Sequence, residues 1–151
     1  MYSVYDIANW FLRNIKDLTN KKLQKLVYYA YAWHLVFNNE SSENITTRLF
    51  ENNFEAWVHG AVIPSLYDKY KAYGSGILPS NNDELPSFSE DEIDVLEQVC
   101  EIYGNYNGNE LESINHQELP WLNARKGLPS NEPSHNKISD FDIFTCYSER
   151  L

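Results

Sequence analysis

The chain has 151 residues, of which 42% are hydrophobic and 15% aromatic, and it carries 12 lysines and arginines against 22 aspartates and glutamates. This length predicts one domain that buries a sizeable core without a metal ion or a disulfide. The net charge of −10 argues against a surface that binds nucleic acid or an acidic membrane, because phosphate groups would be repelled.

The first two predicted elements are helices with clear start signals. Ser3 can cap a helix that ends near Asn14, since Asp6 follows three residues later in the capping-box pattern. Thr19 can cap a second helix, in which the run 26–37 is apolar on nearly every face. Such a helix needs cover on several sides, so we predict that it is the central helix. Its predicted core face consists of Leu23, Leu26, Val27, Ala30, Trp33, His34 and Phe37.

Shorter elements are predicted in the middle of the chain. Residues 48–58 predict at most a small hairpin, and Gly60 allows a backbone turn that other residues disfavour. Pro64 suits the first turn of a helix that continues to about Tyr73. Residues 75–88 are rich in glycine, proline and polar residues and predict a long loop.

Further helices are predicted in the second half. Ser89 and Ser139 each begin a capping-box pattern, and a short helix near 110–116 is predicted to close at Pro120. Together the elements predict a mostly α fold with about six helices. We expect a single compact helical domain over residues 1–151, built around the central helix, with at most a small β-hairpin.

The charge is distributed unevenly. Residues 1–71 hold 8 basic side chains against 7 acidic ones, residues 72–124 hold none against 11, and residues 125–151 hold 4 against 4. The acidic middle segment should attract a basic partner, although a solvated acidic face is the alternative interpretation.

Three lysines, Lys21, Lys22 and Lys25, lie at the start of the central helix, where the helix dipole is already positive. One interpretation is a solvated helix start, with the long stems lying over neighbouring residues. The other is a site for an acidic group, either from a partner or from the protein itself.

Compartment is predicted from what the sequence lacks. The apolar run 26–37 is short of the ~20 residues needed to cross a bilayer, and no signal-peptide pattern follows Met1. We therefore predict a cytoplasmic protein without a membrane partner. Cys100 and Cys146 fall on apolar positions of predicted helices, which favours buried, reduced thiols.

Candidate catalytic residues are few. The usual phosphate-binding, hydrolase and metalloprotease motifs are missing, and the four histidines are not spaced as a helical metal pair, so we predict no metal and no cofactor. His34 is predicted to be a hydrogen-bonded core residue. His59 and His116 are predicted in loops beside Trp57 and Trp121, where functional residues concentrate.

Aromatic side chains suggest a protein-binding surface. Tyrosine combines a large apolar area with a hydroxyl group that tolerates water, which suits an interface. At their spacings, some of the tyrosines around the central helix should be exposed; these are Tyr28, Tyr29, Tyr31, Tyr67, Tyr70 and Tyr73.

Three segments carry a family resemblance: LQKLVYYAYAWHL (23–35), LFENNFEAWVHGAVIPSLYDKYKAYG (49–74) and LESINHQELPWLNAR (111–125), followed by Ile138 and Tyr147. In this order they resemble the Panacea domain, which is the SocA-like, phage-associated antitoxin domain. The combination of KLQKL, FEAW-x-x-G-x-V-x-P and H-x-x-x-P-W is specific. The family usually has Gly-Pro-Val where this chain has Gly60-Ala61-Val62.

The resemblance implies a non-enzymatic antitoxin of a bacterial or prophage toxin–antitoxin pair. Such a protein inhibits a cognate toxin, encoded by the adjacent gene, through direct protein–protein binding. Toxins paired with this domain include tRNA-modifying enzymes, other translation inhibitors and membrane-acting peptides. For this chain we predict masking of a basic, active or tRNA-binding toxin surface. Candidate partner-binding residues are Lys22, Lys25, Tyr29, Trp57, His59, Gly60, Val62, Pro64, Tyr67, His116 and Trp121.

Two alternatives stay open. The resemblance also allows an adaptor that delivers the toxin to a protease. A more distant alternative is an enzyme whose acid–base site gathers His59, Glu55 and His116 with Lys22 or Lys25. The oligomeric state is not predicted.

Overall fold

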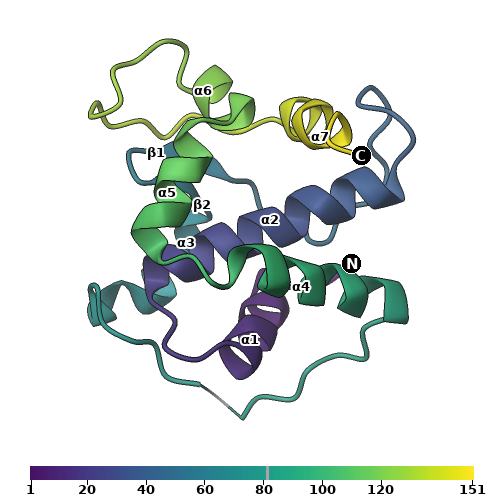
Figure 1. Ribbon diagram of the computed structural model, residues 1–151, viewed down its shortest axis with the longest axis vertical. Helices are drawn as coiled ribbons and strands as arrows, with labels where there is room; N and C mark the ends of the chain where they lie inside the picture. The colour runs from purple at the N-terminus through teal and green to yellow at the C-terminus, as the bar shows by residue number, and fades with distance from the viewer. Residues whose placement is uncertain (81) are drawn as a thin grey trace.

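The computed structural model describes residues 1–80 and 82–151, and within them the chain is mostly helical, as predicted. Seven α-helices, one short 3-10 helix and one two-stranded sheet are found in these residues (Figure 1). In chain order they are α1 (Val4–Asn14), α2 (Asn20–Asn38), β1 (Glu55–Trp57), β2 (Gly60–Val62), α3 (Pro64–Tyr70), the 3-10 helix η1 (Lys71–Tyr73), α4 (Glu90–Tyr103), α5 (Gly108–His116), α6 (Leu119–Ala124) and α7 (Asp140–Ser148).

Helix α2 is the axis of the domain, which confirms the predicted central helix. Helices α1, α3, α4, α5 and α7 and strand β2 all pack against it, and Figure 1 shows it running through the middle of the molecule. Thr19 caps it by accepting a hydrogen bond from the backbone N–H of Lys22. The prediction for Phe37 was wrong, since 50% of this residue is exposed. It lies in the last turn of α2, where its ring stacks on Trp33 and lines a small groove with residues of α4.

The helix start signals are confirmed at Ser3 and Ser89, which both form complete capping boxes. Pro120 was interpreted incorrectly. Helix α5 ends at His116, and Pro120 lies in the first turn of α6, a helix that was not predicted. Proline is tolerated there because the first N–H groups of a helix have no partner within the helix.

The predicted small hairpin is present. Strands β1 and β2 are antiparallel, with Ala56 opposite Ala61, and the connection turns through Val58 and His59. The outer edge of β1 is covered by the loop between α6 and α7, residues 125–139, which we call the C-terminal loop. The backbone N–H of Ala56 donates to Asn136 O in this loop at 2.8 Å. The hairpin therefore lies between α2, α5 and this loop.

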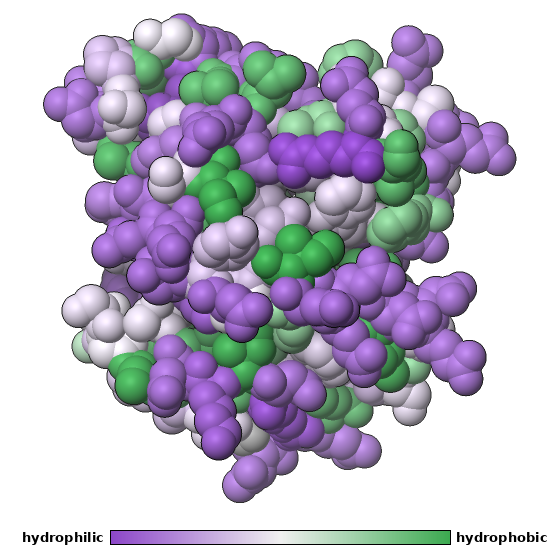
Figure 2. All heavy atoms as spheres, in the orientation of Figure 1, coloured by the Kyte–Doolittle hydropathy of each residue, from purple (hydrophilic) through white to green (hydrophobic). Residues whose placement is uncertain are grey.

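Side-chain burial explains the aromatic content. Four of the six tyrosines considered above are buried, whereas Tyr67 (36% exposed) and Tyr73 (47% exposed) reach the surface, as predicted for part of this set. His34 is buried as expected, but its Nδ1 has no hydrogen-bond partner among the described residues. Polar residues cover much of the face in Figure 2, with apolar side chains scattered between them.

In the part of the chain that the structure describes, no helix combines the length and the apolar character needed to cross a bilayer. Cys100 and Cys146 are half-buried free thiols, and burial raises the pKa of both.

Candidate functional site

Six side chains from the helical part of the domain hold the backbone of the hairpin. They come from α2, from α5, and from α6 with the residue that follows it. We call this set the hairpin clamp, and it consists of Gln24, Lys25, Asn115, His116, Trp121 and Arg125. Because these side chains serve backbone groups that the short two-stranded ladder leaves unpaired, the hairpin has a fixed position on the helices.

Two adjacent residues of α2 contact strand β2 and the residue that follows it. Gln24 accepts a hydrogen bond from the N–H of Ile63 at 3.1 Å, and Lys25 Nζ donates to Ala61 O at 3.0 Å. Asn20 fixes the amide of Gln24 by accepting from its Nε2 at 3.0 Å. The first turns of α2 thus form part of the site as well as of the core.

Helix α5 contacts the other side of the turn. Asn115 Oδ1 accepts from the N–H of Ala61 at 2.8 Å, and His116 Nε2 donates to Val58 O at 2.7 Å. The bond to Asn115 requires a residue with a backbone N–H at position 61, and proline would lack it. Ala61 therefore makes a hydrogen bond that a proline at this position, as in the usual Gly-Pro-Val, could not make.

The end of α6 completes the clamp. Trp121 Nε1 donates to Trp57 O at 2.8 Å, and Arg125 donates to Ala56 O at 3.0 Å. The guanidinium of Arg125 also donates to Pro129 O and Glu132 O and lies 4.7 Å from the centre of the Trp121 ring. Arg125 thereby joins strand β1 to the C-terminal loop.

Gly60 sits where the clamp is most crowded. Its φ is +105°, and a Cβ added there would lie 2.5 Å from Lys25 Cε and 2.7 Å from Asn115 Oδ1. Both the backbone conformation and the space require glycine.

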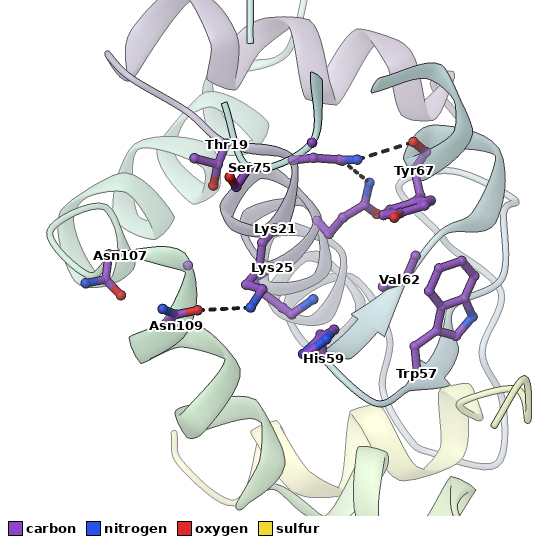
Figure 3. A pocket seen from close by; sticks show the side chains of 14 residues that line it. Thr19, Lys21, Lys25, Trp57, His59, Val62, Tyr67, Ser75, Asn107 and Asn109 are labelled. Carbon is purple, nitrogen blue, oxygen red and sulfur yellow. Dashed lines mark hydrogen bonds between the residues drawn. The ribbon is translucent and has the colours of Figure 1, made fainter. Parts of the chain in front are cut away.

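A groove of about 540 Å³ opens beside the hairpin (Figure 3). Figure 3 shows Lys21, Lys25 and His59 near its centre, Trp57, Val62 and Tyr67 on one side, and asparagines on the other. Its lining comes from the starts of α2 and α5, the hairpin, α3 and the residues that follow η1. The lining residues are Thr19, Asn20, Lys21, Gln24, Lys25, Trp57, His59, Val62, Tyr67, Gly74, Ser75, Asn107, Gly108 and Asn109. A volume of this size suits a drug-sized ligand or a few side chains of a partner.

A three-membered charge cluster includes Lys21 and His59, which both line this groove. Lys21 Nζ is 2.9 Å from Glu112 Oε1, and His59 Nδ1 is 2.8 Å from the same oxygen. Burial pushes the pKa of Glu112 upward, but the hydrogen bonds and charges of Lys21 and His59 outweigh it and bring this pKa below its usual value. Glu112 is therefore ionised at neutral pH and offsets the charge of Lys21.

Lys25 is buried, contrary to the interpretation of a solvated helix start. Only 1% of the residue is exposed, and burial lowers the pKa of its ammonium to about 7. Lys22 is half-buried and donates to Gly104 O at 2.6 Å. A pairing of either lysine with Glu55 is not formed, since Glu55 contacts His135 and Trp57 instead.

The predicted partner-binding residues fall into separate groups. Five line the groove, namely Lys25, Trp57, His59, Val62 and Tyr67. Gly60, His116 and Trp121 belong to the hairpin or its clamp, and Pro64 begins α3. Tyr29 is buried, with its hydroxyl donating to Glu118 at 2.7 Å and its ring stacked on Tyr103, so it does not reach the surface.

The residues of the enzymatic alternative are directed to different partners. His59 contacts Glu112, His116 contacts Val58 O, and Glu55 contacts His135. His116 is also the last residue of α5 rather than a loop residue, and burial lowers its pKa. Among the described residues, no group of histidine, cysteine, aspartate or glutamate side chains is arranged to hold a metal ion.

Three members of the clamp were not predicted from the sequence: Gln24, Asn115 and Arg125. One of them had a usable signal: Gln24 lies in a helix that is apolar on nearly every face, and a buried amide there needs a hydrogen-bond partner. Asn115 and Arg125 lie at ordinary positions near helix ends, and nothing local distinguishes them.

Comparison with known families identifies the family to which the chain is similar. A family model described as antitoxin SocA-like, Panacea domain, covers residues 23–122. The matched range includes the hairpin, all of the clamp except Arg125, and the groove lining except Thr19, Asn20 and Lys21. Neither the comparison with curated proteins nor that with solved structures found a match.

Proposed function

The chain belongs to the SocA-like Panacea domain family of antitoxins, and we propose that it neutralises a cognate protein toxin by binding it directly. The toxin is expected from the adjacent gene, and binding would mask its active or tRNA-binding surface. The observation that carries this proposal is the family match itself, because the matched range holds the hairpin and most of the residues that line the groove.

The groove is the surface that suits this role best. Its wall carries Trp57, Val62 and Tyr67, and the Trp57 and Tyr67 rings meet edge to face with centroids 5.1 Å apart. Exposed aromatic rings on a rigid support are typical anchors of protein interfaces. The hairpin clamp supplies that support, since it fixes the strands that carry Trp57 and Val62.

The acidic face of α4 supports a basic partner. The exposed acids on this helix are Glu90, Asp91, Asp94, Glu97 and Glu101. Such a field acts over a distance, so it can steer a basic toxin without forming the interface. We expect added salt to slow toxin association more than it accelerates dissociation, and stopped-flow measurements at low and high salt would check this. Equal effects on the two rates would contradict steering.

The direct test is co-expression with the neighbouring toxin gene. The wild-type chain should restore growth and co-purify with the toxin. Tyr67→Ala is expected to weaken toxin binding by roughly tenfold or more, because truncating a central aromatic anchor costs about 2 kcal/mol. Isothermal titration calorimetry on the purified pair would measure the change in dissociation constant.

The matched control is Phe141→Ala, which removes an aromatic residue that is 51% exposed on α7, outside the groove. It should bind the toxin like the wild type. Wild-type protein that neither rescues growth nor co-purifies would overturn the proposed function. An unchanged toxin half-life during rescue is expected for masking, whereas a shortened half-life would favour delivery to a protease.

A further inference from the structure

The charge at the inner part of the groove is not balanced within the domain. Lys25 Nζ donates to Ala61 O, and among the described residues no carboxylate forms an ion pair with it. The acidic group whose charge acts on Lys25 is Glu112, which is already paired with Lys21 and His59. An ammonium group has three N–H donors, and a buried one is costly unless an anion faces it.

The surroundings of Lys25 add positive potential. Residues 19–21 and 107–109, which line the groove, are the first residues of α2 and α5 with their caps. Helix N-termini carry partial positive charge, and two of them border the groove. Gly108 allows this approach, because the stem of Lys21 packs against it, 3.2 Å from where a Cβ would stand.

The opposite wall is apolar and open to solvent. Tyr67 and Trp57 are partly exposed there, and Val62 lies between them and Lys25 in Figure 3. The occupant that matches both walls carries one carboxylate beside an apolar side chain. A polyanion such as RNA fits poorly, because the chain has a net charge of −10 and 11 acidic side chains without a basic one in residues 72–124.

We propose that the groove receives an aspartate or glutamate side chain of the toxin, with its carboxylate against Lys25 and a neighbouring apolar residue against Trp57 and Tyr67. This inference rests on the proposed function and specifies the chemistry of the bound segment. The carboxylate replaces the anion that the domain does not supply, and the aromatic wall provides the apolar contact area.

The pairing also makes binding dependent on pH. Burial lowers the pKa of Lys25 to about 7, and the titratable groups that face it are Lys21 on α2, Glu112 and His116 on α5, and His59 in the hairpin turn. A bound carboxylate favours the charged ammonium and raises this pKa. Above pH 7 binding must therefore take up a proton, and affinity falls as pH rises.

The test uses the full chain, labelled with nitrogen-15, and three short peptides followed by NMR. The probes are acetyl-Glu-Phe-amide, acetyl-Gln-Phe-amide and acetyl-Gly-Phe with a free carboxyl terminus. The Glu peptide should shift the signals of groove residues and bind roughly tenfold more tightly than the Gln peptide, as expected for a charge-assisted contact. Its affinity should fall by roughly tenfold between about pH 6.5 and 8.5, while that of the Gln peptide stays nearly constant.

Two variants separate the roles of the lysines. Lys25→Met should remove the preference for Glu over Gln and the pH dependence. If this buried variant misfolds, Lys21→Gln, at a partly exposed lysine of the groove, should still weaken binding of the Glu peptide severalfold, whereas Lys16→Gln, at an exposed lysine outside the groove, should not.

Several results would overturn the inference. They are equal binding of the Glu and Gln peptides, no shifts at millimolar peptide, shifts outside the groove, tighter binding of the free-carboxyl peptide, or tighter binding of a short RNA. Because the peptides bind without the toxin, this test fails independently of the rescue experiment. Rescue without peptide selectivity would retain the antitoxin role and remove the carboxylate site.

Discussion

Gly60→Ala is expected to destabilise the domain by roughly 3–5 kcal/mol and to abolish toxin neutralisation. The φ of +105° is strained for any residue with a Cβ, and the new atom would stand 2.5 Å from Lys25 Cε. To relieve that overlap, Lys25 and Asn115 must move, and both hold Ala61 through hydrogen bonds. Urea unfolding followed by tryptophan fluorescence would measure the loss.

Gly127→Ala is the matched control. Gly127 also has a positive φ, of +78°, but no atom lies within 4 Å of the position that its Cβ would take. This variant should lose only about 1–2 kcal/mol, which is the backbone cost alone. Equal losses in the two variants would show that the contact with the clamp contributes nothing, and the account of Gly60 would then be wrong.

The fold was largely predictable because its signals are local. Ser3, Thr19 and Ser89 begin helices through their own side chains, and the apolar pattern of α2 marks it as the central helix. Pro120 shows the limit of such signals. A proline after a short helix is compatible both with the end of that helix and with the first turn of another, and only packing decides between them.

The site was predictable only in part, because its contacts join distant segments. In the sequence, Lys25 resembles a solvated lysine near a helix start. In the structure, β2 packs against it, and its Nζ donates to Ala61 O at 3.0 Å. Likewise, the sequence suggests that Tyr29 is an interface residue, whereas in the structure its hydroxyl donates to Glu118 and its ring stacks on Tyr103. Residue type and helical position indicate which side chains are unusual, but the partners that bury them lie 36 or more positions away.

Besides Gly60, the position of the hairpin depends on Arg125. It is 1% exposed, and none of the described carboxylates forms an ion pair with it. Its hydrogen bonds go to backbone carbonyls of Ala56, Pro129 and Glu132. A buried guanidinium without an anion is costly, so its presence must be offset by these bonds and by its stacking on Trp121.

Arg125→Met should therefore lower the free energy of unfolding by roughly 3–4 kcal/mol, because three carbonyl groups lose their donor while the side-chain volume is nearly kept. Hydrogen exchange should show the segment 129–132 opening first. Arg48→Met is the control: Arg48 pairs with Asp140 at 2.8 Å in a partly exposed position, where loss of the pair costs about 1 kcal/mol or less. If Arg125→Met were as stable as Arg48→Met, relief from burying the charge would outweigh the three hydrogen bonds, and Arg125 would not hold the hairpin to the C-terminal loop.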